Sequence, residues 1–229
     1  MVIGKGLISS VFSNYIDSED ILIFASGVSD SNETRISEFN RELELVRLSL
    51  IKYPTMLFVY FSTYSIDHIC LNSRPYTKHK LNIENLIQEN SSNYLICRLS
   101  NIVGAGGNSS NIFNYIVDGI KNEKPINVWA NASRSILGLD ELKSILTYII
   151  DAEERNKVIT IASGTSYKLP DLISRIEIHF GKVFTGTYLD KGGDSNININ
   201  SIKKYLDLLD ADFSINYIDN LLNKYYPCL

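Results

Sequence analysis

Tyr76 and Lys80 are the two residues of this sequence whose types and spacing best suit catalysis. They stand four positions apart at the start of a segment with helical periodicity, so their side chains share one face of the helix. A lysine ammonium close to a phenol lowers the pKa of the phenol, which makes tyrosine a usable acid or base near neutral pH. Thr63, at the end of an apolar run, offers a hydroxyl to a substrate oxygen. The alternative is an exposed Tyr/Lys pair on an ordinary helix, because Tyr-x-x-x-Lys also occurs by chance.

Gly4 and Gly6 form a second candidate site, at the first turn from strand to helix. The pattern is G-x-G-x-x-S, with Ser9 at the third small position. In a parallel α/β sheet, ligands bind beyond the carboxyl ends of the strands. Gly4 would permit a tight turn, and Gly6 would let a pyrophosphate approach the helix N-terminus, where free N–H groups favour anions. A glycine turn before an ordinary helix is the alternative.

The elements that must position these residues alternate between short apolar runs and helical patterns. The runs are continuously apolar, which is typical of parallel strands covered on both faces. The sequence therefore predicts a doubly wound, Rossmann-like α/β fold. We expect strands at 2–3, 20–26, 55–62, 93–100, 126–130 and 157–163, and helices at 7–15, 38–51, 76–88, 110–121, 140–152 and 169–180, with two short helices in 201–226.

Composition narrows the class of protein. The chain has 229 residues, 45% of them hydrophobic, and a net charge of −4, which argues against a nucleic-acid-binding protein. No apolar run reaches the roughly 18–20 residues of a membrane span, and the N-terminus shows no secretory signal. Three cysteines without a CxxC and three scattered histidines indicate neither a disulfide framework nor a metal site. We therefore expect a cytoplasmic protein.

The order of these motifs resembles the extended short-chain dehydrogenase/reductase family, in its group of nucleotide-sugar epimerases, dehydratases and reductases. The glycine turn, Thr63 and Tyr76-x-x-x-Lys80 follow one another as they do there. Three further segments match in order. The first is the strand DILIFAS with Ala25, and the second is an R-x-x-N-x-x-G pattern formed by Arg98, Asn101 and Gly104. The third begins at Arg134 and continues to Asp140 and Glu141.

The resemblance implies a role for each matching residue. Tyr76 would donate or accept the proton, Thr63 would hydrogen-bond the reacting sugar oxygen, and Lys80 would hold the nicotinamide ribose and tune Tyr76. Asn101 and Arg134 would bind the diphosphate of the nucleotide sugar, although Arg134 could instead form a surface ion pair with Asp140 or Glu141. The cofactor, NAD or NADP, would be held by Gly4, Lys5, Gly6, Leu7, Ile8, Ala25, Ser26, Tyr76 and Lys80.

The sequence departs from the family pattern in two places. The second strand, the following helix and the third strand of the family pattern are missing or reduced to a loop between the glycine turn and residue 20, although that unit normally forms the adenosine pocket. The distance from Thr63 to Tyr76 is also about half the family norm. One interpretation is a compact reductase; the other is a non-catalytic binding or assembly subunit with a decayed cofactor site. Retention of Thr63, Tyr76 and Lys80 together favours the first.

The residues after Thr63 bear on the reaction. Dehydratases of the group place an acid pair there, whereas this chain has Tyr64 and Ser65, which argues against a 4,6-dehydratase. A shortened adenosine pocket releases its cofactor readily, as a reductase requires and an epimerase does not. We therefore expect a nucleotide-sugar 4-ketoreductase, with 4-epimerase as the alternative. We also expect a dinucleotide-binding core at 1–125, a mixed region with the substrate-binding portion at 126–229, and a homodimer through the helices 38–51 and 76–88, with no nucleic-acid or membrane partner.

Overall fold

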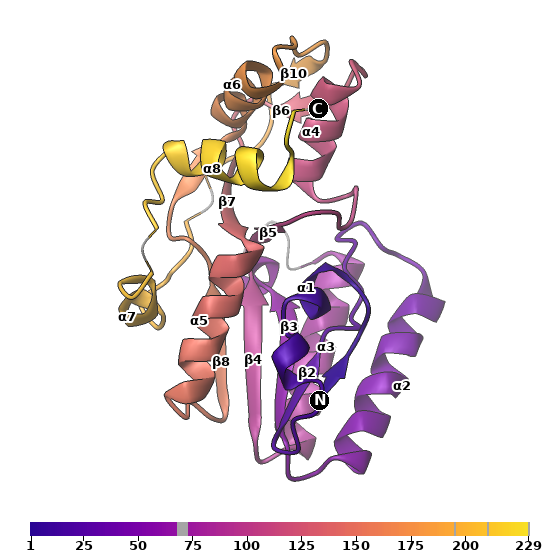
Figure 1. Ribbon diagram of the computed structural model, residues 1–229. Helices are drawn as coiled ribbons and strands as arrows, with labels where there is room; N and C mark the ends of the chain where they lie inside the picture. The colour runs from indigo at the N-terminus through magenta and orange to yellow at the C-terminus, as the bar shows by residue number, and fades with distance from the viewer. Residues whose placement is uncertain (68–72, 195, 210, 229) are drawn as a thin grey trace. The chain divides into compact units, whose positions relative to one another are not determined.

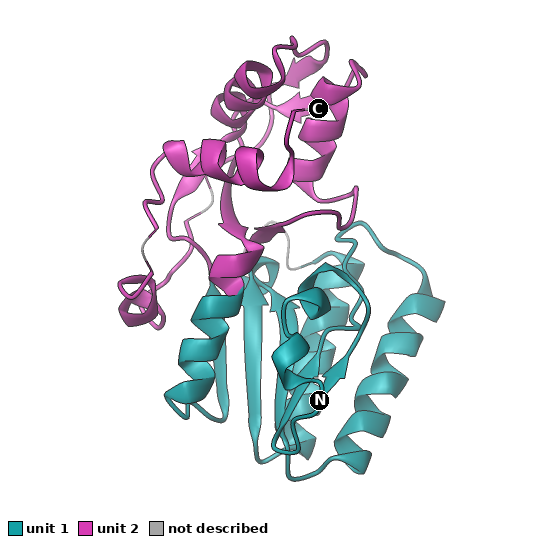
Figure 2. Cartoon of the chain, viewed as in Figure 1, with its two compact units in different colours: residues 1–99, 143–161 teal, residues 100–142, 162–229 magenta. Residues whose placement is uncertain are grey.

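The chain forms two compact units. The computed structural model describes residues 1–67, 73–194, 196–209 and 211–228, so His68, Cys70 and Asp210 lie outside the described residues. Unit 1 comprises residues 1–99 and 143–161, and unit 2 comprises residues 100–142 and 162–229 (Figure 2). The sequence suggested one division, at residue 125; the chain instead passes between the units after residues 99, 142 and 161.

Unit 1 is built on a parallel five-stranded sheet (Figure 1). Its order is β1 (Val2–Ile3), β2 (Ile21–Phe24), β3 (Leu57–Thr63), β4 (Tyr94–Leu99) and β8 (Lys157–Ile161). All seven residues of the central strand β3 are buried, which explains its continuous apolar run. The predicted α/β class with a parallel sheet is confirmed. The strand β1 stands at one end of the order.

Helices cover both faces of this sheet. On one face, α2 (Ile36–Lys52) and α3 (Pro75–Asn90) pack their apolar stripes on the strands. The buried residues there are Leu22, Phe24, Val46, Leu50, Met56, Phe58, Tyr60, Ile83, Ile87 and Ile96. On the other face, Phe12 stacks on Phe61 with 5.9 Å between the ring centroids.

The helix expected at 7–15 is shorter than the sequence suggested. The helix α1 spans Leu7–Ser10, and a 3₁₀ turn, η1, follows at Ser13–Tyr15. The hydroxyls of Ser9 and Ser10 each donate to a carbonyl three residues earlier, at 2.7 Å, and such local bonds compete with continued helix. Phe12 then enters the core with no exposed surface, so the chain turns where a straight helix would have carried that ring away from the sheet.

Unit 2 surrounds a separate core. The helices α4 (Ile112–Lys121), α6 (Leu169–Phe180) and α8 (Asn216–Tyr225) all contribute buried residues to it. The strand β7 (Ser133–Gly138) pairs in parallel with β5 (Asn101–Val103) and antiparallel with β9 (Ser166–Lys168). The strands β6 (Asn127–Trp129) and β10 (Thr187–Leu189) form a second, parallel pair. The strands β5, β7 and β9 were not expected, because three-residue strands carry no readable periodicity and β7 merges with the helical pattern after it.

The remaining elements are short or link the units. A 3₁₀ turn, η2 (Tyr64–Asp67), follows β3, and α5 (Leu139–Asp151) carries the chain from unit 2 into unit 1. The tail holds α7 (Lys203–Leu206) before α8, which confirms two short helices in 201–226. Within the described residues, none of the helices has the length and apolar character that crossing a membrane requires.

Candidate active site

Three candidate residues stand where neighbouring strands of unit 1 end. Gly4 follows β1, Ala25 follows β2, and Thr63 is the last residue of β3. These strands are adjacent and parallel, with Ile3 opposite Phe24 and Phe24 opposite Tyr60. Their carboxyl ends therefore meet at one edge of the sheet, which is where ligands bind in open α/β folds.

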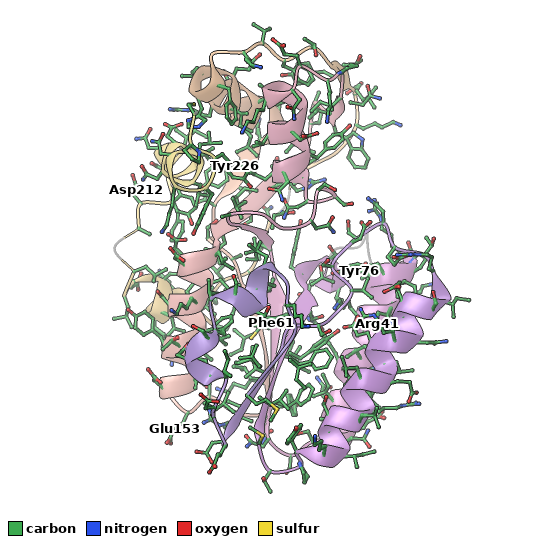
Figure 3. The ribbon with its side chains drawn as sticks, turned by 45° about the vertical axis from the view of Figure 1, so that its right-hand side comes forward. Arg41, Phe61, Tyr76, Glu153, Asp212 and Tyr226 are labelled. Carbon is green, nitrogen blue, oxygen red and sulfur yellow. The ribbon has the colours of Figure 1, made fainter. Side chains whose placement is uncertain are left out.

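Helix α3 brings Tyr76 and Lys80 into the interior of unit 1. Pro75 occupies the first turn, where a missing N–H costs nothing, so Tyr76 lies at the very start of the helix (Figure 3). Tyr76 is 8% exposed and Lys80 is 2% exposed. The pair is therefore not the exposed Tyr/Lys pair that was the alternative from the sequence.

The hydroxyl of Thr63 is close enough to the phenol of Tyr76 to act on it, because it lowers the pKa of Tyr76. The backbone N–H of Ser65 donates to Thr63 Oγ1 at 3.2 Å. Thr63 is itself buried, at 7% exposure. The structure thus joins two of the three residues that the sequence predicted to be catalytic, from β3 and from α3.

Lys80 directs its ammonium group at three oxygens of its own chain. Its Nζ lies 2.9 Å from Glu42 Oε1, 3.1 Å from the Tyr60 hydroxyl and 3.4 Å from the Phe61 carbonyl. An ammonium has three donors, so these contacts account for all of them. The carboxylate and the phenol that hold Lys80 come from α2 and β3, and neither was among the predicted site residues.

Glu42 is the centre of this arrangement, which we call the Glu42 cluster: Glu42, Tyr60, His79 and Lys80. Besides Lys80, the fully buried carboxylate accepts hydrogen bonds from the Tyr60 hydroxyl at 2.6 Å, from His79 Nε2 at 2.9 Å and from the Val28 N–H at 2.7 Å. Burial by itself would raise the pKa of Glu42, but the Lys80 charge and these hydrogen bonds outweigh it and lower the pKa below its ordinary value.

A signal for Glu42 was present in the sequence and was not recognised. The helix around it was assigned an apolar stripe that includes Phe39 and Val46. Position 42 lies between these two on the same stripe, three residues after one and four before the other. A glutamate on an apolar stripe indicates a buried carboxylate, and a buried carboxylate requires a partner.

The pKa of Tyr76 is shifted in the direction opposite to the one expected. The sequence argument held that the ammonium lowers the pKa of the phenol, but the structure gives Tyr76 a pKa above its ordinary value. The main cause is burial, followed by the negative charge of Glu42, and the Thr63 hydroxyl only partly opposes them. Lys80 is paired with Glu42 at 2.9 Å, which opposes the effect of its charge on the phenol.

The glycine turn has the local geometry that a pyrophosphate requires. Gly4 has φ +140°, and a Cβ there would lie 2.3 Å from the Ala25 carbonyl oxygen, so only glycine fits. A Cβ on Gly6 would meet nothing within 4 Å, which leaves the turn open to a ligand. No side chain caps the first turn of α1, where Leu7 and Ile8 lie, and Lys5 is exposed. The residues present therefore fit the phosphate portion of a dinucleotide.

Ser26, the last of the predicted cofactor residues, follows Ala25 in the segment after β2. Its carbonyl accepts a hydrogen bond from Arg41 Nη1 at 3.1 Å. Arg41 precedes Glu42 on α2 and is labelled in Figure 3. The segment after β2 is thus attached to α2 at Ser26 and at Val28.

A second buried carboxylate fixes the residue beside Thr63. The Ser62 hydroxyl donates to Glu84 Oε1 at 2.5 Å, and Arg98 Nη2 donates to Glu84 Oε2 at 2.6 Å. Arg98 also pairs with Asp67, at 2.5 Å, at the end of η2. The arginine of the R-x-x-N-x-x-G pattern therefore holds the end of β3 and the turn that follows it.

Asn101 and Arg134, the predicted substrate-binding residues, lie in unit 2 on the neighbouring strands β5 and β7. Asn101 Nδ2 donates to the Ser135 carbonyl at 3.0 Å, and Arg134 Nη1 donates to the Ser133 carbonyl at 2.7 Å. Asp140, the proposed ion-pair partner of Arg134, pairs with Lys224. Asn101 therefore lies on the strand that pairs with the strand of Arg134. The predicted catalytic and cofactor-binding residues all belong to unit 1.

Comparison with known proteins gives matches among solved structures. No family profile matches the sequence, and neither does any curated protein. UDP-glucuronic acid 4-epimerase from Bacillus cereus, solved with UDP-glucuronic acid and NAD, has a TM-score of 0.74 at 16% identity, over 91% of this chain and 74% of that chain.

Two further structures are similar over most of this chain. MoeE5 in complex with UDP-glucose and NAD has a TM-score of 0.73 at 11% identity, over 97% of this chain and 96% of that chain. RMD from Pseudomonas aeruginosa, complexed with NADPH, has a TM-score of 0.70 at 16% identity, over 96% of this chain and 84% of that chain. The chain therefore shares its fold with these three proteins, two of which were solved with NAD and one with NADPH, and a fold of this kind is what the resemblance of its motifs implied.

Proposed function

We propose that this chain is an NAD(P)-dependent oxidoreductase that reduces the keto group of a nucleotide-linked 4-keto sugar. One observation carries the proposal. Gly4 and Ala25 follow the ends of β1 and β2, Thr63 ends the adjacent parallel strand β3, and the Thr63 hydroxyl acts on the phenol of Tyr76. This arrangement supports a cofactor-binding turn and an acid for a carbonyl oxygen at the carboxyl ends of neighbouring strands. The similar structures that contain NAD or NADPH share this fold.

Tyr76 and Thr63 would handle the substrate oxygen. A nicotinamide cofactor held at the glycine turn would supply the hydride that the carbonyl carbon needs. Tyr76 donates its phenolic proton to the carbonyl oxygen, which becomes a hydroxyl, and Thr63 hydrogen-bonds the same oxygen. The phenol afterwards regains its proton from solvent.

Reduction and epimerisation begin from different forms of Tyr76. An epimerase first removes a proton from a sugar hydroxyl and needs the phenolate, whereas a reductase begins from the phenol. Burial and the charge of Glu42 raise the pKa of Tyr76, which disfavours the phenolate. A 4-epimerase is nevertheless the second candidate, because the Bacillus cereus structure and a UDP-glucose 4-epimerase from Bifidobacterium longum share the fold.

The cofactor would lie on the glycine turn, against Gly4, Lys5, Gly6, Leu7, Ile8, Ala25 and Ser26. Lys80 would reach a ribose hydroxyl by exchanging its longest contact, the one at 3.4 Å to the Phe61 carbonyl. Asn101 and Arg134 would bind the diphosphate of the sugar nucleotide, a role that suits the planar guanidinium.

A third candidate, from a different class, is a non-catalytic binding subunit. It is favoured by the contacts of Lys80, since all three donors of its ammonium already meet oxygens of this chain. Incubation with NADH or NADPH and a panel of nucleotide-linked 4-keto-6-deoxy sugars decides between the classes. We expect loss of the reduced-nicotinamide absorbance with at least one substrate, and Tyr76→Phe should abolish turnover while dinucleotide binding persists.

The result that would overturn the enzymatic function is the absence of both turnover and binding. A dinucleotide at one hundred times its dissociation constant stabilises the folded state by about 2.7 kcal/mol, which a thermal-shift measurement detects. No shift with NAD, NADP or their reduced forms, together with no absorbance change, would favour the binding subunit.

A further inference from the structure

Glu42 is a fully buried carboxylate that the proposed reaction does not use. Its removal from water is costly, and a fold tolerates such a group only when its partners recover the cost. The four donors around it, from Val28, Tyr60, His79 and Lys80, come from three separate segments of the chain, because His79 and Lys80 both lie on α3. A group held from so many directions cannot reorient, so its charge acts at a fixed place.

The backbone after β2 closes over the ion pair of Glu42 and Lys80. A Cβ on Gly27 would lie 2.6 Å from Lys80 Nζ and 2.7 Å from Glu42 Oε1. Glycine therefore lets this segment pack directly on both charged groups. The pair is enclosed by α2, by α3, by β3 and by the backbone of Gly27, and it interacts at the strength of a buried pair rather than of a screened one.

The Lys80 ammonium is also close to the phenol of Tyr76. The distance from Lys80 Nζ to the Tyr76 ring centroid is 5.8 Å, which is within the range where an unbalanced positive charge favours a phenolate. Glu42 Oε1 lies closer to Nζ, at 2.9 Å, so the carboxylate opposes the effect of the ammonium on the phenol. Burial and the negative charge of Glu42 then raise the pKa of Tyr76, and the Thr63 hydroxyl partly opposes them.

We propose that Glu42 is a positioning residue that binds the Lys80 ammonium, keeps Tyr76 in its protonated form, and so commits the site to donating a proton to a carbonyl oxygen. The claim that the site donates a proton to a carbonyl oxygen rests on the proposed function. The claim that Glu42 keeps Tyr76 protonated does not. His79 and Tyr60 orient the carboxylate, and Phe39 stacks on the His79 ring at 4.5 Å between centroids.

Other charges near these groups do not replace Glu42. Asp30 also acts on Tyr76, and it adds to the effect of Glu42 because it has the same sign. Glu84 acts on Tyr60 but is bound to Arg98. Among the described residues, Lys80 is the lysine that pairs with Glu42, at 2.9 Å, and His79 Nε2 donates to the same carboxylate at 2.9 Å. Glu42 is therefore the group whose removal should change Tyr76 most.

The test is an NMR titration of the full chain labelled with 13C at the tyrosine ζ carbon. The resonance missing from Tyr76→Phe identifies Tyr76, which is needed because the chain has 14 tyrosines. In the wild type we expect Tyr76 to ionise above 10.0, the ordinary value for tyrosine. In Glu42→Gln we expect at least about tenfold more phenolate at a given pH, because the ammonium then acts unopposed.

The matched control is Glu44→Gln, which removes an exposed carboxylate from the same helix and should leave Tyr76 unchanged. Ionisation of wild-type Tyr76 below 10.0 overturns the proposal, and this measurement needs no Glu42 variant to fold. A folded Glu42→Gln with the wild-type titration also overturns it, since a merely structural Glu42 would alter stability alone.

The directional part is read from the pH profile of the reverse reaction, oxidation of the product sugar. We expect the alkaline rise in kcat/KM to move to lower pH in Glu42→Gln and to stay in place in Glu44→Gln. A pH profile that does not move in Glu42→Gln contradicts the claim that Glu42 favours proton donation to a carbonyl oxygen. Failure of every sugar in the panel counts against the proposed function, and the titration still decides the role of Glu42.

Discussion

The ion pair between Glu42 and Lys80 should show strong thermodynamic coupling in a double-mutant cycle. The three variants are Glu42→Gln, Lys80→Met and the combination of both. Glu42→Gln leaves a buried ammonium without its counterion, and Lys80→Met leaves a buried carboxylate without its cation. The combined variant leaves neither charge and keeps a carbonyl acceptor for the Tyr60 hydroxyl.

The magnitude follows from the burial of both groups. Glu42 is 0% exposed and Lys80 is 2% exposed, so solvent cannot screen a charge left behind. Removing one partner of a buried pair costs about 3–5 kcal/mol. The combined variant has one carbonyl oxygen where Glu42 has two carboxylate oxygens, so the N–H of Val28 or of His79 loses its acceptor, at a cost of about 1–3 kcal/mol. It should therefore be more stable than either single variant, although it carries both substitutions.

The assay is equilibrium unfolding in urea followed by far-UV circular dichroism, with the midpoint and the slope recorded for each variant. The single tryptophan, Trp129, lies on β6 of unit 2, so its fluorescence reports on the unit that none of the variants touches. A combined variant less stable than both single variants would refute the buried pair, because independent substitutions add.

The remaining predictions concern pH and the glycine turn. Because folding lowers the pKa of Glu42, its contribution to stability is present above about pH 4.5 and is lost as the pH falls below that value. The difference in unfolding free energy between wild type and Glu42→Gln should therefore narrow from pH 6 to pH 3. A difference that does not change over this range would contradict the prediction. Gly4→Ala should destabilise the fold by about 1–3 kcal/mol, because its Cβ would meet the Ala25 carbonyl at φ +140°, and urea midpoints measure this. Gly6→Ala, with φ −89°, should preserve stability and weaken dinucleotide binding in a thermal shift; equal losses of stability in both variants would contradict the assignment.

Most of the unit 1 fold was predictable because its signals are local. The strands β2, β3 and β4 read as continuous apolar runs, since a parallel strand covered on both faces has no polar side. The helix carrying Tyr76 and Lys80 was predictable from its spacing, and Pro75 confirms its start. In unit 2 the strand β6 was predicted, whereas β5 and β9 were missed because three residues show too few alternations to be recognised, and β7 was missed because its apolar residues merge with the helical pattern after it.

The sequence alone determined that Tyr76 and Lys80 share a helix face and that Gly4, Ala25 and Thr63 end successive strands, because these are consequences of helical and strand geometry. Only the tertiary structure decided what Lys80 does with its charge. Glu42 is 38 positions away from Lys80, and the two meet because α2 and α3 pack side by side on one face of the sheet. The sign of the pKa change at Tyr76 depends on that packing, since a neighbouring charge and loss of solvent act through distance in space and not through spacing along the chain.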